Sequence, residues 1–125
     1  MQAPYIRVFA ADDGESHFED CNMPLESFDY APPAPPLLLS SLSPGSGVLI
    51  MSCEPGWSGD WHPGPRRQWM FWLSGATTIE VSDGEVRTVT AGTILLSEDT
   101  TGKGHRSWDA GQGTVLIAIV PIPDA

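Results

Sequence analysis

The residues best suited to chemistry lie between positions 61 and 73, in the stretch WHPGPRRQWMFWL. Side chains of a β-strand alternate between its two faces, so if His62 points into a barrel, Gln68 does so as well. Met70 and Trp72 continue the same face. A histidine in an apolar pocket can take or give a proton near neutral pH. This face therefore predicts acid–base chemistry.

Two prolines interrupt this stretch and leave a second alternative open. A bulge at Pro63 or Pro65 would shift the alternation, and Trp69 and Phe71 would then line the pocket. In either case Arg66 or the neighbouring amide could hold an oxyanion or a carboxylate. Such a set suits dehydration, isomerisation, cyclisation or decarboxylation of a small, mostly apolar molecule.

The tryptophans are the second unusual feature. Four of the five, Trp57, Trp61, Trp69 and Trp72, fall within sixteen positions. Indoles could fill the core of a small barrel or line a pocket for a flat ligand, and we expect a mixture of the two roles. The candidate substrate-binding residues are Asp60, Trp61, Arg66, Met70 and Trp72.

No nucleophile stands in an activating context. Cys53 lies in or beside an expected strand and is expected in the core, because free cysteines are commonly buried. The loop over residues 98–104, EDTTGKG, has the glycines of a phosphate cradle but not the spacing of a Walker loop. We expect a loop at the barrel rim, with Asp99 orienting either Arg106 or His105.

The elements that position these residues are short strands. Gly and Pro together make 25 of 125 residues, 20%, against about 12% on average. Asp83-Gly84 is a strong hairpin signal. The predicted strands span residues 48–52, 68–73, 77–82, 85–90, 93–97 and 114–120, a spacing typical of an all-β sandwich or small barrel.

The N-terminal third is less regular. Residues 5–9 alternate and predict a short strand at a sheet edge. Residues 31–36, APPAPP, predict an extended polyproline segment over the surface. We therefore expect residues 1–36 to form an N-terminal arm with a Pro-rich linker, and residues 37–125 to form the barrel, within one structural domain.

Composition excludes several classes of function. Six Lys and Arg against sixteen Asp and Glu give a formal charge of −10, which argues against binding nucleic acid or an anionic membrane surface. No apolar run approaches the ~20 residues of a spanning helix. Without a secretory signal or a disulfide framework, the sequence predicts a soluble cytoplasmic protein.

The stretch from residue 56 to residue 105 resembles the cupin family of small jelly-roll barrels. In the first cupin motif, a Gly precedes His-x-His, a Glu and a further Gly; here Gly56, His62, Gln68 and Gly75 stand in that order. In the second motif, a Gly precedes Pro-x-Gly and a His; here Gly84, Gly92 and His105 follow that order. The resemblance implies a cupin jelly-roll barrel and extends weakly through the Pro-rich linker.

Two family positions depart from the pattern. The second His of the family falls at Gly64, and its Glu falls at Gln68. The resemblance thus leaves His62, Gln68 and His105 as catalytic candidates and as a tentative metal set for Zn, Fe, Ni or Mn. Two imidazoles suit such metals, but a third firm ligand is usual. Asp60, or His17 from the arm, could supply it; otherwise no metal is bound.

Three hypotheses follow. The favoured one is a small cupin enzyme, a lyase, isomerase or cyclase, acting on one small organic molecule through His-based acid–base chemistry. The second is a metal-dependent cupin, an oxygenase or metal-assisted lyase, using His62, Gln68 and His105. The third is a non-catalytic cupin that binds or senses a small ligand. Small cupins generally dimerise, so the resemblance also implies a homodimer.

Overall fold

The computed structural model describes residues 1–124 of the chain. These residues form twelve β-strands and contain no helix. The strands are β1 (Gln2–Ala10), β2 (Ser16–Pro24), β3 (Glu26–Phe28), β4 (Leu37–Leu39), β5 (Leu49–Cys53), β6 (Ser58–His62), β7 (Gln68–Ser74), β8 (Ala76–Val81), β9 (Val86–Thr90), β10 (Ile94–Glu98), β11 (His105–Asp109) and β12 (Val115–Pro121). No helix among residues 1–124 is long and apolar enough to cross a membrane.

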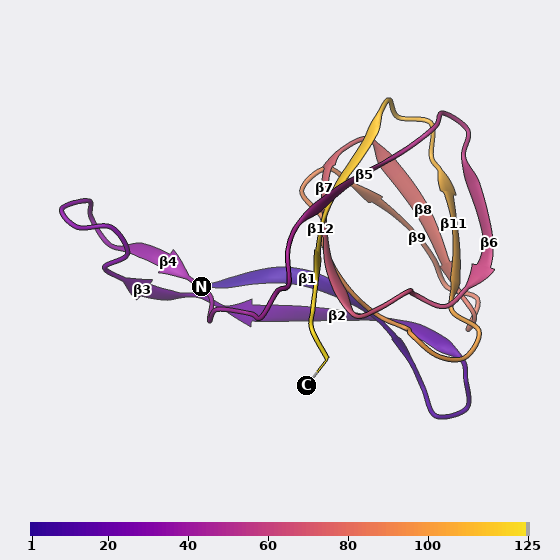
Figure 1. Cartoon of the computed structure of the whole chain (residues 1–125), viewed down its shortest axis with the longest axis horizontal. Helices are drawn as coiled ribbons and strands as arrows, with labels where there is room; N and C mark the ends of the chain where they lie inside the picture. The colour runs from indigo at the N-terminus through magenta and orange to yellow at the C-terminus, as the bar shows by residue number, and fades with distance from the viewer. Residues whose placement is uncertain (125) are drawn as a thin grey trace.

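Two sheets face each other as a β-sandwich (Figure 1). The larger has six strands in the order β2-β1-β10-β7-β12-β5, and the smaller has four in the order β6-β11-β8-β9. Strand β1 runs parallel to β10, and the other pairs are antiparallel. The prediction of an all-β sandwich is confirmed.

The strands that sequence patterns predicted are those with alternating or β-branched side chains. They correspond to β5, β7, β8, β9, β10 and β12 within one or two residues. Three further strands of the sandwich were not predicted: β2, β6 and β11. The sequences SGDWH in β6 and HRSWD in β11 contain no β-branched residue, so neighbouring strands, rather than local preference, hold them extended.

The core lies between the two sheets. Trp72 of β7, Ile79 of β8 and Ile117 of β12 are buried there with seven other apolar residues. Their strands alternate as a sandwich requires, because inward side chains recur at every second position. Each fully buried aliphatic or aromatic side chain of this kind contributes about 1.5–3 kcal/mol to folding.

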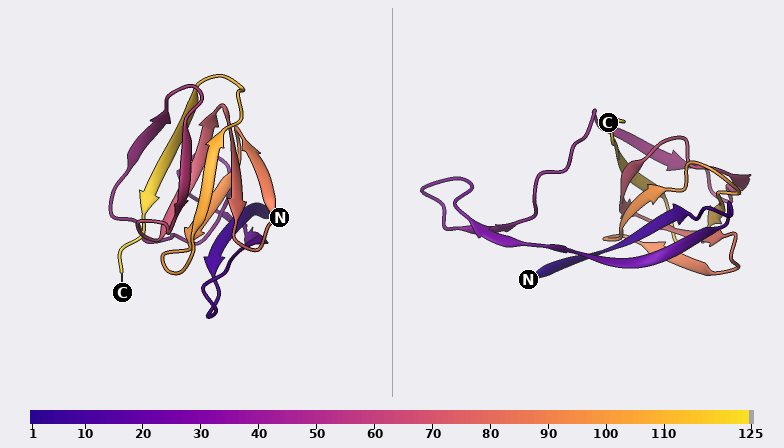
Figure 2. Two further views of the ribbon diagram at one scale, coloured as in Figure 1. Left: turned by 90° about the vertical axis from the view of Figure 1, so that its right-hand side faces the viewer. Right: turned by 90° about the horizontal axis from the view of Figure 1, so that it is seen from below.

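The N-terminal region departs from the expectation in two ways. Strand β1 lies between β2 and β10, so residues 5–9 are not at a sheet edge. Strands β3 and β4 form a separate hairpin that projects from the sandwich (Figures 1 and 2). Residues 31–36 turn at its tip, where the Ala34 N–H donates to the Ala31 carbonyl, and are not an extended linker.

Candidate functional site

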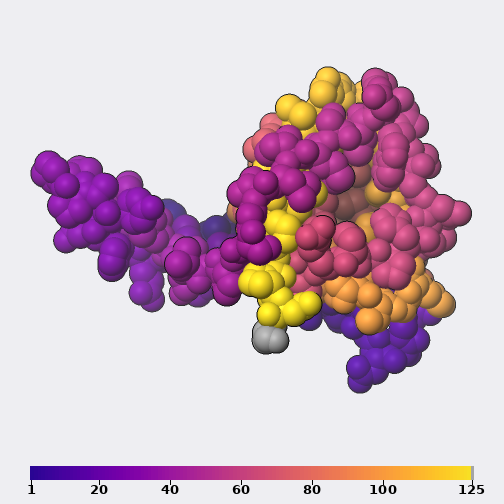
Figure 3. Space-filling view, viewed as in Figure 1, coloured from indigo at the N-terminus to yellow at the C-terminus, as the bar shows by residue number. Residues whose placement is uncertain are grey.

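A cavity of about 310 Å³ opens between the two sheets. Its mouth lies on the side where β5 and β6 form the free edges of their sheets, and a hollow is visible there in Figure 3. Among residues 1–124, none of the lining side chains belongs to Lys, Arg, Asp or Glu. The lining is Val8, Met51, Ser52, Cys53, Trp57, His62, Pro65, Gln68, Met70, Trp72, Thr77, Ile79, Leu95, Ser97, His105, Ser107 and Ile117.

Two histidines meet at one wall of this cavity. His62 ends β6 and His105 begins β11, and the two residues pair directly across the ladder. Their ring centroids are 4.8 Å apart, with the planes inclined by 55°. Gly104 permits this approach, because a Cβ at that position would lie 2.0 Å from the carbonyl oxygen of His62. Any larger residue would force the two strand ends apart.

His105 is held by a buried carboxylate. Its Nδ1 lies 2.5 Å from Oδ2 of Asp99, and Asp99 is 0% exposed. A carboxylate only accepts hydrogen bonds, so Nδ1 carries the proton and donates it to Asp99. Nε2 has no hydrogen-bond partner among the described residues and is the ring nitrogen left for a molecule in the cavity.

Asp99 is itself fixed from two sides. The Ser97 hydroxyl donates to Oδ1 over 3.1 Å, and the Gly64 N–H donates to the Asp99 carbonyl over 2.9 Å. The Ser16 hydroxyl donates to the carbonyl of Gly104, just before His105, over 2.6 Å. These contacts hold the carboxylate and the imidazole in one relative orientation, which is the arrangement that a general base requires.

His62 is oriented by the backbone. Its Nδ1 lies 2.8 Å from the carbonyl oxygen of Asp60, and because a carbonyl only accepts, this nitrogen also carries the proton. The Asp60 carboxylate accepts from the Trp61 backbone N–H over 2.8 Å and does not line the cavity. Both imidazoles therefore keep Nε2 as the nitrogen without a protein partner among the described residues.

The opposite wall comes from β7. Gln68, Met70 and Trp72 line the cavity, while Trp69 and Phe71 stack on the outer side of the sheet with centroids 6.5 Å apart. Pro63 and Pro65 therefore do not shift the alternation of side chains along this stretch, and the face that begins at Gln68 lines the cavity. The Trp72 indole donates to the Thr77 hydroxyl over 3.0 Å. The Gln68 side chain is buried and has no hydrogen-bond partner among residues 1–124, so its amide is free for a ligand.

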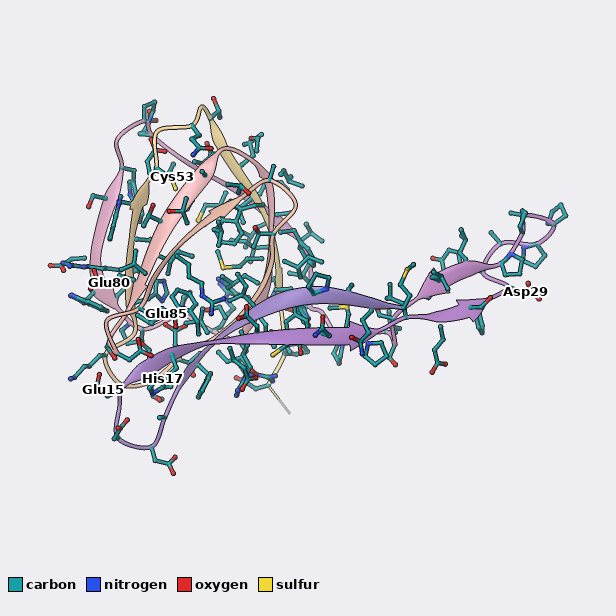
Figure 4. The ribbon with its side chains drawn as sticks, turned by 180° about the vertical axis from the view of Figure 1, so that it is seen from behind. Glu15, His17, Asp29, Cys53, Glu80 and Glu85 are labelled. Atoms are coloured by element: carbon teal, nitrogen blue, oxygen red, sulfur yellow. The ribbon has the colours of Figure 1, made fainter. Side chains whose placement is uncertain are left out.

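The remaining candidates lie away from the cavity. Arg66 is exposed and outside the lining. Trp61 packs beneath the Arg106 guanidinium at 5.2 Å, outside the lining. His17 binds Asp83 over 2.8 Å, and it lies at the opposite end of the sandwich from Cys53, which lines the cavity (Figure 4).

The donor set does not fit a three-ligand metal centre. Within residues 1–124, no group of three or more His, Cys, Asp or Glu side chains could hold a metal ion. Asp60 and His17, the two expected sources of a third ligand, are engaged elsewhere. A Cβ at Gly64 would lie 3.0 Å from Ser97 Oγ and 3.2 Å from Asp99 Oδ1. Ser97 and Asp99 therefore occupy the space that the side chain of a metal ligand at position 64 would need.

Several residues of the site carry no clear sequence signal. Ser97, Ser107 and Thr77 join the lining through the pairing of distant strands. Trp57, one of the four clustered tryptophans, also lines the cavity. The sequence left Asp99 with two possible partners, and the structure places it on His105, while Arg106 binds Glu80 over 2.8 Å. Burial, with a smaller contribution from the charge of Asp109, raises the pKa of the Cys53 thiol.

Comparison with known proteins adds no activity. No family model matches the chain, and no curated protein matches it. A conserved protein of unknown function from Streptococcus pyogenes is similar in structure, with a TM-score of 0.46, 20% identity, and coverage of 69% of this chain and 72% of that one. A candidate ethanolamine utilization protein Q from Salmonella typhimurium gives a TM-score of 0.39 and 13% identity, with coverage of 100% and 99%.

Proposed function

We propose that this chain is a small cupin-like enzyme that isomerises, dehydrates or cyclises a small uncharged molecule by acid–base chemistry. The observation that carries the proposal is the buried Asp99 carboxylate on His105 Nδ1, which leaves Nε2 at an apolar cavity. This is how a general base is commonly oriented, with a carboxylate fixing the tautomer and direction of an imidazole.

The cavity limits the substrate. A cavity of about 150 Å³ can hold benzene, so 310 Å³ has room for a molecule of one or two rings. Since no lysine or arginine among the described residues lines it, a phosphate or a free carboxylate would be buried without a counter-charge, which is costly. Indole and thioether groups favour an apolar or aromatic body with a single carbonyl or hydroxyl group.

Each residue then has a defined task. His105 Nε2 takes a proton from the carbon beside the substrate carbonyl. The electron pair of the broken C–H bond forms a carbon–carbon double bond, and the π pair of the carbonyl moves onto its oxygen. The Gln68 amide donates to that oxygen as negative charge develops on it. For isomerisation of a β,γ-unsaturated ketone, the imidazolium returns the proton to the γ carbon of the dienolate, so that the carbon–carbon double bond moves into conjugation with the carbonyl. For dehydration of a β-hydroxy ketone, the imidazolium of His105 donates the same proton to the hydroxyl. The enolate re-forms the carbonyl as the carbon–oxygen bond breaks, and water leaves.

Deuterium exchange tests this proposal and does not require the product to be identified. A panel of one- and two-ring ketones is incubated in D2O with the protein, and loss of the proton beside the carbonyl is followed by NMR. The wild type should accelerate exchange for the ketones that fit, and His105→Gln should abolish the acceleration. His17→Gln is the matched control, because it removes a histidine outside the cavity.

The contrary outcomes are equally clear. Exchange that persists at the wild-type rate in His105→Gln would refute the role of His105. Tight binding of a ketone with no exchange at all would instead support a non-catalytic binding protein.

A further inference from the structure

The cavity has two chemically different ends. At one end, which we call the histidine end, Gln68 pairs with Ser97 across the large sheet. The Ser97 hydroxyl donates to the Asp99 carboxylate that holds His105, and His62 lies beside that imidazole. This end therefore holds the two Nε2 atoms and the amide that have no hydrogen-bond partner among residues 1–124.

The other end lies four residues further along the strands of the large sheet. On β12, Pro121 pairs with Gln68, whereas Ile117 pairs with Trp72 on one side and with Met51 on the other. Four residues of an extended strand span about 13 Å. We call this end the aromatic end, and its lining includes Met51, Cys53, Trp57 and Trp72.

The aromatic end offers little hydrogen bonding to a ligand. The Trp72 indole N–H already donates to the Thr77 hydroxyl over 3.0 Å. Burial raises the pKa of the Cys53 thiol, which is therefore uncharged at neutral pH. Ser52 borders the cavity here but is exposed at its mouth. The part of a ligand that lies at this end is therefore apolar.

Trp57 enters the cavity over a glycine of β6. His62 pairs with His105, and the next pair joins Gly59 to Ser107, so β6 carries one residue more than β11 between the two pairs. Because directly paired residues share a face of the sheet, this bulge places Gly59 on the cavity-facing side with Ser107. A Cβ at Gly59 would lie 2.5 Å from Cη2 of Trp57. Since Gly59 does not have a positive φ, the glycine provides room for the indole.

The backbone of Trp57 is fixed through both of its polar groups. Its N–H donates to the Glu54 carbonyl, and its carbonyl accepts from the Asp109 N–H, each over 2.9 Å. The Asp109 carboxylate also accepts from the Gly56 N–H over 2.9 Å. The turn between β5 and β6 is thus tied to the end of β11, and the indole is held in place before a ligand binds, which lowers the entropy cost of binding.

We propose that Trp57, seated over Gly59, forms a subsite for an aromatic ring, and that the substrate is an aryl ketone whose ring and carbonyl lie at opposite ends of the cavity. The placing of the carbonyl rests on the proposed function, whereas the ring subsite does not. A flat ring gains from stacking on the indole and from contact with the Met51 sulfur. A short carbon chain between ring and carbonyl bridges the two ends.

Calorimetric titration of the full chain with two ketones tests the ring subsite without any need for turnover. The probes are benzylacetone, in which two methylenes join a phenyl ring to a methyl ketone, and its cyclohexyl analogue, which has the same carbon skeleton without the π system. The wild type should bind benzylacetone about five- to ten-fold more tightly. Trp57→Leu should abolish this preference, and Trp57→Phe, which keeps an aromatic ring, should retain part of it.

Two further variants control the experiment. Trp61→Leu is the matched control, because Trp61 is 37% exposed against 39% for Trp57 and lies outside the cavity lining; the preference should be unchanged. Gly59→Ala displaces the indole with a Cβ and should lower the preference without altering Trp57 itself. Thermal melts show whether each variant folds, and the comparison of the two ketones in the wild type requires no variant.

Nuclear Overhauser effects between protein and bound benzylacetone determine its orientation. The phenyl protons should contact the Trp57 indole and the Met51 methyl group, and the methyl ketone protons should contact the His105 ring. The reverse orientation would overturn the proposal, as would equal affinity of the wild type for both ketones, no binding of either, or a preference that survives Trp57→Leu. A phenyl preference with no deuterium exchange would support the ring subsite and refute only the proposed reaction.

Discussion

Asp99→Asn is the substitution that most sharply tests the acid–base site. The side chain keeps its shape, but its charge is lost. Asp99 is fully buried and receives hydrogen bonds from His105 and Ser97. An asparagine offers one acceptor oxygen and one amide nitrogen, so it cannot serve both donors, and the proton on Nδ1 of His105 loses its charged acceptor.

The magnitude follows from that one contact. A hydrogen bond to a charged group contributes about 1.5–3 kcal/mol. At 1.36 kcal/mol for each factor of ten, losing it in the transition state lowers kcat by about 10- to 150-fold. Asp99 does not line the cavity, so KM should stay within about two-fold.

The assay is deuterium exchange into the best ketone of the panel, with kcat and KM measured separately. Denaturant unfolding accompanies it, because removing a buried carboxylate also costs stability. A change in KM alone, with kcat at the wild-type value, would refute the role of Asp99 in orienting His105. A loss of kcat no larger than the fraction of the variant that is unfolded would also refute this role.

Three further substitutions or modifications have defined outcomes. Gly64→Ala places a Cβ against Ser97 and Asp99, so it should lower kcat by about ten-fold while far-UV circular dichroism stays unchanged; an unaltered rate would contradict the packing argument. Burial opposes ionisation of Glu98, but hydrogen bonds from Arg7 and Arg67 at 2.6 and 2.7 Å outweigh it and lower its pKa. Glu98→Gln should therefore cost about 1–3 kcal/mol at neutral pH, and the deficit should vanish as the pH falls through that lowered pKa; a deficit that persists in acid would argue against the ion pairs. Because the pKa of Cys53 is raised, its alkylation should be slow at neutral pH and accelerate at alkaline pH; a cavity ligand should protect Cys53 and not Cys21, and equal protection would place the ligand elsewhere.

The sequence predicted those parts of the fold in which each strand carries its own pattern. Strands β7 to β10 were expected because their side chains alternate and Asp83-Gly84 closes a hairpin. The same alternation grouped Gln68, Met70 and Trp72 on one face, but the two prolines left open whether this face or the one with Trp69 and Phe71 lines the cavity. The grouping succeeds because the period of a strand determines its faces without reference to the rest of the fold.

What the sequence did not predict depends on contacts between distant segments. Strands β6 and β11 carry polar side chains and are held extended by pairing: β11 pairs with β8 on one side and with β6 on the other. The β6–β11 pairing also brings His62 beside His105. Asp99 contacts His105 and not Arg106, because Arg106 binds Glu80 of β8 instead. Residues 31–36 turn because β3 and β4 pair on either side of them, a contact that proline content alone does not indicate.

One measurement tests the central claim most directly, namely deuterium exchange by wild-type protein treated with a strong chelator, beside untreated wild type and His105→Gln. If His105, oriented by Asp99, transfers the proton, the chelated and untreated proteins should catalyse deuterium exchange into the ketone at the same rate. His105→Gln should not accelerate the exchange. Exchange that disappears on chelation and returns with an added divalent metal would contradict this account.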